Sequence, residues 1–401
     1  MPQQKTSSPA SSGQRSTVGG RPRQPWRLTD RRAASAAERI VIKIGSSSLT
    51  SADGSLNLPQ ITELARTVSG MVTSGREVIV VSSGAIAAAL RPMGLVERPQ
   101  SFAEQQAAAS IGQGLLVKAW SDAFMIYGVH VGQVLLTEND MIRSETYRNV
   151  RASLEALLGL RVVPIVNEND TTATHEIRFG DNDRLASLVA QSVGADLLVL
   201  LTDVDGLFTK PPHEAGAERI SVVPDAARLD GVEIGSTGTR VGTGGMVTKL
   251  SAAHNAAITG TATILTVPEQ LQQALAGEDV GTFFPAGTGR RRSRLMWLRY
   301  ATRGVGTLVL DDGAIRAITE SRRSLLPVGI VDVRGEFRAG GPVDIEGRDG
   351  TLYARGLSHF SSADIRAMAG RTSDELRAQL SDDHARYVVH RDELVVLTKR
   401  D

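Results

Sequence analysis

Short runs of consecutive apolar residues alternate with segments of helical spacing over the first two thirds of the chain. A strand buried on both faces of a sheet is typically a continuous apolar run, whereas a covering helix has apolar residues three and four positions apart. This alternation predicts a mainly parallel sheet with helices on both faces, a three-layer αβα sandwich. The predicted strands are 40–44, 77–81, 129–136, 161–166, 196–201 and 261–266. The predicted helices are 58–74, one that follows the turn at 82–86, 102–127 with a break at 112–114, 147–158, one through 185–190, 250–258 and 269–276.

The pattern changes at two places. Residues 210–240 contain several prolines and glycines, which predicts loops and short strands. Beyond residue 285, short β segments are separated by Asp-Gly and Gly-Gly turns, which predicts a small, mostly β, barrel-like domain. These segments are 306–310, 328–333, 342–345 and 352–356, followed from residue 364 by a polar helical segment and a charged tail.

Composition marks the ends of the folded parts. Residues 1–37 are rich in Ser, Gly, Pro and Arg and lack the apolar stretch of a secretory signal. They fit a disordered extension better than a transit peptide, because no amphipathic helix is visible. We therefore expect an extension (1–37), an α/β domain (38–285), a linker (286–304), a β domain (305–382) and a C-terminal tail (383–401).

The overall composition excludes several classes of protein. The chain has 401 residues, of which 41% are apolar, enough for two ordinary domains. It has no cysteine, which excludes disulfides and thiolate metal sites. A net charge of +1 does not call for a polyanionic partner. No apolar run approaches the roughly 20 residues of a membrane span, so we expect a cytoplasmic protein.

Two clusters of acidic and amide residues stand at the ends of predicted elements. Asn167-Glu168-Asn169-Asp170 directly follows a strand, and Gly180-Asp181-Asn182-Asp183 opens a helix. Ligands of open α/β folds bind at the carboxyl edge of the sheet. Carboxylates suit an ammonium group, and amides donate to a carboxylate. Such residues are also common in turns, but two dense clusters favour a site for a small zwitterion.

Three glycine-rich turns follow strands, at 45–47, 82–84 and 242–245. None fits the Walker A pattern or the dinucleotide fingerprint. Two of them lie beside a lysine. Lys43 is inside an apolar strand, where an unpaired ammonium group is costly, and Lys249 is in the first turn of a helix, where it opposes the helix dipole. Lysines that converge with glycine-rich turns indicate a clamp for a triphosphate.

The ordered set of motifs resembles the glutamate 5-kinases of the amino acid kinase family. The motifs are V-I-K-I-G-S-S-S-L-T, V-S-S-G-A-I, N-E-N-D, F-G-D-N-D, L-T-D-V-D-G-L-F and G-T-G-G-M-V-T-K-L. The β domain resembles a PUA domain, through segments such as Gly306-Thr307-Leu308 and Ala354-Arg355-Gly356-Leu357. The resemblance implies ATP-dependent phosphorylation of the γ-carboxylate of L-glutamate to L-glutamyl 5-phosphate, the first step of proline synthesis.

The resemblance also implies a role for each matching residue. The glutamate-binding residues would be Ser83, Asp170 and Asn182, with Asp181 as a further member. The ATP-binding residues would be Lys43, Thr202, Asp203, Thr243, Gly244, Gly245, Met246, Val247, Thr248 and Lys249. Lys43 and Lys249 would offset charge on the transferred phosphoryl group, and Asp183 would orient both lysines.

The resemblance further implies cofactors and partners. Mg²⁺ is expected to arrive with ATP rather than at a metal site of the protein, and seven histidines without a cysteine do not suggest zinc. We expect inhibition by L-proline, a homo-oligomer (dimer or tetramer) and hand-off of the product to glutamyl phosphate reductase. We expect no membrane partner and no nucleic acid, because the chain is nearly neutral and poor in aromatic residues.

Two alternatives remain open at this point. One is another kinase of the same fold that acts on carbamate, uridylate or aspartate. The other is an RNA-binding protein with a vestigial kinase domain, since PUA domains of other proteins bind RNA. The presence of Lys43, Asp183 and Lys249 disfavours the second alternative, because charges that are costly to bury tend to be lost from an idle site.

Overall fold

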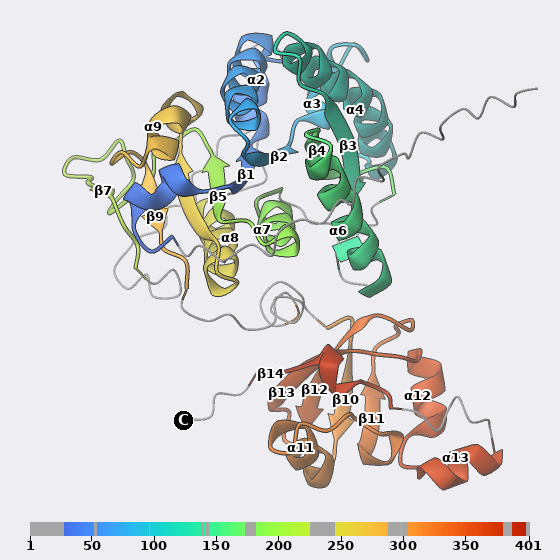
Figure 1. The fold of residues 1–401 in the computed structure, drawn as a ribbon. Coiled ribbons are helices and arrows are strands. Elements are labelled where there is room, and N and C mark those ends of the chain that lie inside the picture. The colour runs from blue at the N-terminus through green and yellow to red at the C-terminus, as the bar shows by residue number, and fades with distance from the viewer. Residues whose placement is uncertain are drawn as a thin grey trace, which may run out of the picture.

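The structure, a computed structural model, describes residues 28–51, 54–95, 97–137, 140–141, 144–172, 182–224, 245–287, 298, 304–379 and 387–397. Figure 1 shows two folded parts, with the larger one above and the smaller one below. Among the described residues, the larger part is built on a seven-stranded sheet and the smaller on a five-stranded sheet. The predicted division into an α/β part and a mostly β part is confirmed.

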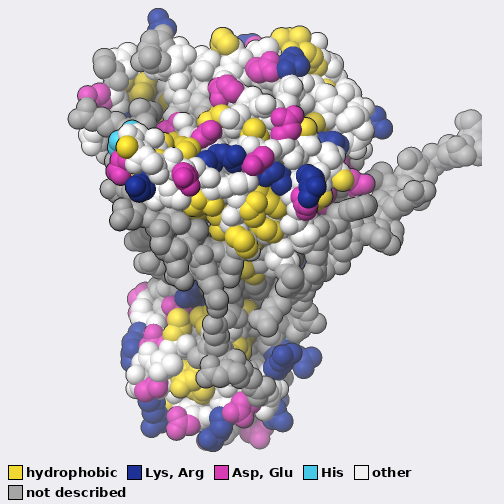
Figure 2. All heavy atoms as spheres, turned by 90° about the vertical axis from the view of Figure 1, so that its left-hand side faces the viewer, with side chains coloured by type: hydrophobic (Ala, Val, Ile, Leu, Met, Phe, Trp, Pro, Cys, Tyr) yellow, Lys and Arg dark blue, Asp and Glu magenta, His cyan; other side chains and the backbone are white. Residues whose placement is uncertain are grey.

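The surface carries charges of both signs. On the face that Figure 2 shows, Lys and Arg side chains are interspersed with Asp and Glu side chains. This arrangement agrees with the net charge of +1. Among the described residues, none of the helices combines the length and the apolar character that a membrane span requires.

The large sheet has the strand order β3-β4-β2-β1-β5-β8-β9. Its strands are β1 (Arg39–Ile44), β2 (Glu77–Ser82), β3 (Val131–Leu136), β4 (Val163–Glu168), β5 (Leu197–Leu201), β8 (Ala262–Thr266) and β9 (Thr282–Phe284). All neighbours pair in parallel except β8 and β9. All six predicted strands are present. The antiparallel edge strand β9 was not predicted, because three residues are too few to form a recognisable pattern.

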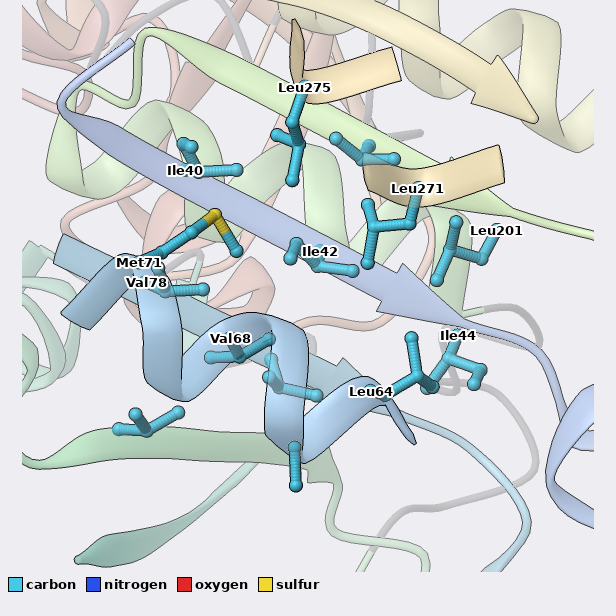
Figure 3. Close-up of a cluster of buried hydrophobic side chains, with 14 of the residues drawn as sticks. Ile40, Ile42, Ile44, Leu64, Val68, Met71, Val78, Leu201, Leu271 and Leu275 are labelled. Atoms are coloured by element: carbon cyan, nitrogen blue, oxygen red, sulfur yellow. The ribbon is translucent and has the colours of Figure 1, made fainter. Parts of the chain in front are cut away.

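Strand β1 supplies alternate residues to the two faces of this sheet, as the period of a strand requires. Ile40, Ile42 and Ile44 belong to one apolar cluster with α2 (Leu58–Thr73) and α9 (Leu271–Ala276), as Figure 3 shows, and with α4 (Phe102–Met125). Val41 belongs to the other cluster, with α6 (Ser144–Gly159), α7 (Asn182–Val193) and α8 (Met246–Ile258). The three-layer sandwich is confirmed, and Lys43 lies on the same face of β1 as Val41, toward α7 and α8.

Residues 28–37 differ from the expected disordered extension. Arg31–Ala36 form the 3-10 helix η1, and Leu28, Ala34 and Ala37 are buried in the first apolar cluster. The buried Arg31 guanidinium donates to the carbonyl oxygens of Glu278, at 3.2 Å, and of Ser221 and Val280. These contacts connect η1 to the turn before β9 and to the end of the short hairpin of β6 (Leu207–Phe208) and β7 (Arg219–Ile220). Residues 1–27 lie outside the described residues.

Helix α4 runs without interruption, so the predicted break at 112–114 is wrong. Gly112 is there because α4 approaches α3 (Ala85–Leu90) closely. A Cβ atom on Gly112 would lie 1.7 Å from the carbonyl oxygen of Ala85, whereas one on Gly114 would meet nothing within 4 Å. The contact places α4 next to the turn that joins β2 to α3, which consists of Ser83 and Gly84.

The smaller part has the strand order β11-β10-β12-β13-β14. Its strands are β10 (Gly306–Leu310), β11 (Ile330–Arg334), β12 (Pro342–Gly347), β13 (Leu352–Leu357) and β14 (Leu394–Val396), and its helices α11 (Asp312–Thr319), α12 (Ser362–Met368) and α13 (Ser373–Gln379). Strand β14 lies within the segment assigned to the tail, and it pairs with β13. The Arg355 side chain donates to the carbonyl oxygen of Leu298, at 3.3 Å, which anchors one residue of the linker.

The two glycines of α4 should respond oppositely to alanine. Gly112→Ala should lower the free energy of unfolding by about 1–3 kcal/mol, because the new methyl group overlaps the backbone of Ala85. Gly114→Ala is the matched control in the same helix and should raise it by up to about 1 kcal/mol through helix propensity. Urea unfolding of both variants measures this. Equal effects would show that α4 and α3 are not in close contact.

Candidate functional site

The carboxyl ends of the parallel strands bring several predicted site residues to one edge of the sheet. Lys43 is near the end of β1, Ser83 directly follows β2, and Asn167 and Glu168 are the last residues of β4. Helix α7 begins at Asn182, and helix α8 begins at Met246. Segments as distant as residues 43 and 249 therefore meet in one place.

Asp183 is at the centre of this edge, and its side chain is 0% exposed. The Lys43 Nζ atom lies 2.6 Å from Asp183 Oδ1. Lys249 Nζ donates to Asp183 Oδ2 at 3.1 Å, and the Thr248 hydroxyl donates to the same oxygen at 3.1 Å. Both lysines are themselves buried. One carboxylate thus holds two ammonium groups from two different elements, β1 and α8.

The electrostatics of this group favour an anion. Burial alone would raise the pKa of Asp183, but the positive charges and hydrogen bonds of Lys43 and Lys249 lower the pKa from 3.8 to about 2. Asp183 is therefore ionised at neutral pH, and the three charged groups sum to +1. Ammonium groups held at the carboxyl edge of a sheet are suited to hydrogen-bond an anion. The arrangement suits a ligand with several negative charges, such as a phosphate group.

A chain of amide side chains lies beside the charged group. Asn182 Nδ2 lies within hydrogen-bond distance of three acceptors: Ser83 Oγ at 2.8 Å, Asn167 Oδ1 at 2.9 Å and the Ser82 carbonyl oxygen at 3.1 Å. Asn182 Oδ1 is buried and has no hydrogen-bond partner among the described residues. The structure therefore brings Ser83 and Asn182 together next to Asp183, with one buried amide oxygen that makes no hydrogen bond within the described part of the chain.

The other predicted residues are placed less completely. Asp170 follows β4 and is half-buried. Thr202 is buried at the end of β5, and its hydroxyl donates to Asp203 at 3.0 Å. Gly245 precedes α8, and Met246, Val247, Thr248 and Lys249 form the first turn of α8. Asp181, Thr243 and Gly244 lie outside the described residues.

Two supporting residues were missed by the sequence analysis. Gln113 of α4 accepts a hydrogen bond at 2.8 Å from Asn167 Nδ2, and Trp120 of α4 donates to the Ser82 hydroxyl at 3.0 Å. Both lie on α4, and the sequence pattern of this helix indicates only that it covers the sheet. Their partners are 54 and 38 positions away, so no local pattern could have revealed them.

Within the described ranges, no group of three or more His, Cys, Asp or Glu side chains could hold a metal ion. The groups that meet at Asp183 are two ammonium groups and one hydroxyl, a set that suits phosphate better than a bare cation.

Comparison with known proteins identifies both parts of the chain. The model of the amino acid kinase family matches residues 38–266, and that of the PUA domain matches residues 306–380. Glutamate 5-kinase of Streptomyces coelicolor is 52% identical over 92% of this chain and 98% of its own length. Glutamate 5-kinase of Salinispora arenicola is 51% identical over 90% of this chain and 98% of its own length. Among solved structures, carbamate kinase from Giardia lamblia bound to AMP-PNP aligns with a TM-score of 0.46 at 17% identity, over 63% of this chain and 99% of that one.

Acid should weaken the ion pairs of Asp183 selectively. A pKa of about 2 in the folded state, below 3.8, means that the carboxylate stabilises the fold above about pH 5 and loses this effect as the pH falls toward 2. Asp183→Asn should therefore lower the free energy of unfolding at pH 6. The difference from the wild type should shrink by about 2 kcal/mol on going to pH 2.5. Urea unfolding at a series of pH values measures this.

Asp122→Asn is the control for this series. Asp122 forms an exposed ion pair with Lys118, at 2.7 Å on α4, so its removal should change the free energy of unfolding by less than about 1 kcal/mol. A difference between wild type and Asp183→Asn that stays constant with pH would contradict the proposed ion pairs.

Proposed function

The chain belongs to the amino acid kinase family, and we propose that it is an ATP-dependent kinase that phosphorylates the γ-carboxylate of L-glutamate to L-glutamyl 5-phosphate. This reaction is the first step of proline synthesis from glutamate. The observation that carries the proposal is the buried Asp183 with Lys43 and Lys249, directly beside the amides of Asn167 and Asn182. Relatives named glutamate 5-kinase span both domains of the chain, which supports the same substrate.

The acceptor requires little chemical activation. A γ-carboxylate has a pKa near 4.3 and is already ionised at neutral pH, so no general base is needed. The enzyme must instead hold the carboxylate oxygen in line with the terminal phosphorus of ATP and offset the charge that accumulates during transfer. Lys43 and Lys249 suit the second task, because Asp183 keeps both ammonium groups in place before the substrates bind.

Glutamate would bind on the side of β2 and β4. The Ser83 hydroxyl and the amide of Asn182 lie within 2.8 Å of each other and offer neutral hydrogen-bonding groups. Asp170, at the end of β4, supplies a carboxylate for the ammonium group, and Asp181 is a further member in the sequence. Together they would recognise both charged ends of an amino acid.

ATP would bind on the side of β5 and α8. Thr202 and Asp203 follow β5, and the segment from Thr243 to Lys249 leads into α8, whose first N–H groups carry partial positive charge. When bound with the nucleotide, Mg²⁺ would neutralise part of the phosphate charge, held mainly by phosphate oxygens and water.

The finer expectations belong to this proposal. They are a cytoplasmic location, inhibition by L-proline, assembly as a dimer or tetramer, and transfer of the unstable acyl phosphate to glutamyl phosphate reductase. The alternative of an RNA-binding protein gains no support from the charges, which are interspersed on the face in Figure 2.

The test is ATP consumption with Mg²⁺ and hydroxylamine, which traps acyl phosphates as hydroxamates. The panel of acceptors is glutamate, aspartate, N-acetylglutamate, carbamate and UMP. We expect a hydroxamate that depends on glutamate, and much weaker turnover with every other acceptor. Preferential turnover of another acceptor would overturn the substrate but keep the kinase, and no turnover with any of them would overturn both.

Lys249→Ala should separate catalysis from glutamate binding. The substitution removes one of the two charges that face the transferred group, so kcat should fall by about 10²- to 10³-fold with little change in the KM for glutamate. Lys118→Ala, which removes an exposed lysine of α4, is the control and should leave kcat unchanged. Steady-state kinetics with both substrates measure this, and an unchanged kcat in Lys249→Ala would refute the role of Lys249.

A further inference from the structure

Helix α4 presents three hydrogen-bonding side chains at a spacing of seven residues. Gln106 Nε2 donates to the carbonyl oxygen of Thr171 at 3.0 Å, Gln113 pairs with Asn167, and Trp120 pairs with Ser82. Residues seven apart lie on the same face of a helix. This face of α4 therefore forms hydrogen bonds at the carboxyl ends of β2 and β4. These two strands lead into Ser83 and Asp170.

Hydrogen bonds fix the orientation of the side-chain amides beside the site. Gln113 Oε1 accepts from Asn167 Nδ2 at 2.8 Å, so the oxygen of Asn167 must point the other way. Asn167 Oδ1 then accepts from Asn182 Nδ2 and from the backbone N–H of Glu168, both at 2.9 Å. The nitrogen of Asn182 is thereby used inside the protein, and its buried oxygen remains for the ligand.

We propose that Gln113 is a positioning residue: its side-chain oxygen sets the orientation of the Asn167 amide and, through it, turns Asn182 Oδ1 toward the ammonium group of the bound amino acid. Only the oxygen of Gln113 performs this task, because Gln113 Nε2 is buried without a hydrogen-bond partner among the described residues. The inference rests on the proposed function, since it specifies how that site recognises its amino acid.

Without the Gln113 oxygen, the orientations of the Asn167 and Asn182 amides would no longer be fixed. The buried Nδ2 of Asn167 would lack an acceptor, and rotation of Asn167 to find one would remove an acceptor from Asn182. A reoriented Asn182 would present N–H rather than oxygen to an ammonium group, which repels it. The effect should fall on glutamate binding, since the hydrogen bond of Gln113 joins it to the amide of Asn167 rather than to the group of Lys43, Lys249 and Asp183.

The experiment compares two substitutions of similar size. Gln113→Met removes the oxygen and should raise the KM for glutamate about tenfold, while kcat and the KM for ATP change less than about twofold. Gln113→Glu keeps an oxygen facing Asn167 and should keep the KM for glutamate within about threefold of the wild type. Gln105→Met is the matched control: Gln105 is on the same helix, but its side chain donates to the carbonyl oxygen of Pro99, so no kinetic change is expected.

Several outcomes would overturn the inference. They are an unchanged KM for glutamate in Gln113→Met, equal losses in Gln113→Met and Gln113→Glu, or a loss that falls on kcat and on ATP as well. If Gln113→Met does not fold, Gln113→Ala, which favours the helix, is held to the same expectations. A wild-type enzyme that forms no glutamate-dependent hydroxamate would overturn the proposed function itself, and that result is distinct because it requires no variant.

Discussion

The burial of one carboxylate between two ammonium groups constrains the whole edge of the sheet. Asp183 is fully buried at the start of α7, and Lys43 and Lys249 reach it from β1 and α8. Burying any one of these charges without its partners would cost free energy. The fold is therefore stable only when β1, α7 and α8 bring all three side chains together. The same requirement brings two ammonium groups together at the edge of the sheet where we propose that a phosphate group binds.

Helices on both faces of the large sheet support this site. The cluster of α6, α7 and α8 carries Asp183 and Lys249, whereas α4 on the opposite side supports the ends of β2 and β4. Helices α7 and α8 thus hold Asp183, Lys249 and Asn182 from one face of the sheet, whereas α4 holds Asn167 and Ser82 from the other. A preorganised arrangement of this kind is what phosphoryl transfer to an already ionised carboxylate requires.

Much of this was predictable from the sequence, for identifiable reasons. Continuous apolar runs predicted the strands, and Lys43 stood out because a lysine within such a run must find a partner. The pairing of Lys43 and Lys249 with Asp183 followed from the family resemblance. The sequence did not reveal β9, the uninterrupted course of α4, the packing of η1 or the contact of Gln113 with Asn167. Strand β9 has only three residues, too few for a recognisable pattern, and the other three features depend on close approach between residues far apart in the chain. Gly112, for example, packs against Ala85, which is 27 positions away.

The most direct test of the central claim is a crystal structure of the protein with L-glutamate, Mg²⁺ and a non-hydrolysable analogue of ATP. The account predicts that Lys43 Nζ and Lys249 Nζ both contact oxygens of the terminal phosphate while Asp183 remains between them, with the γ-carboxylate of glutamate facing the phosphorus. A terminal phosphate bound away from both lysines, or glutamate bound away from Ser83 and Asn182, would contradict it.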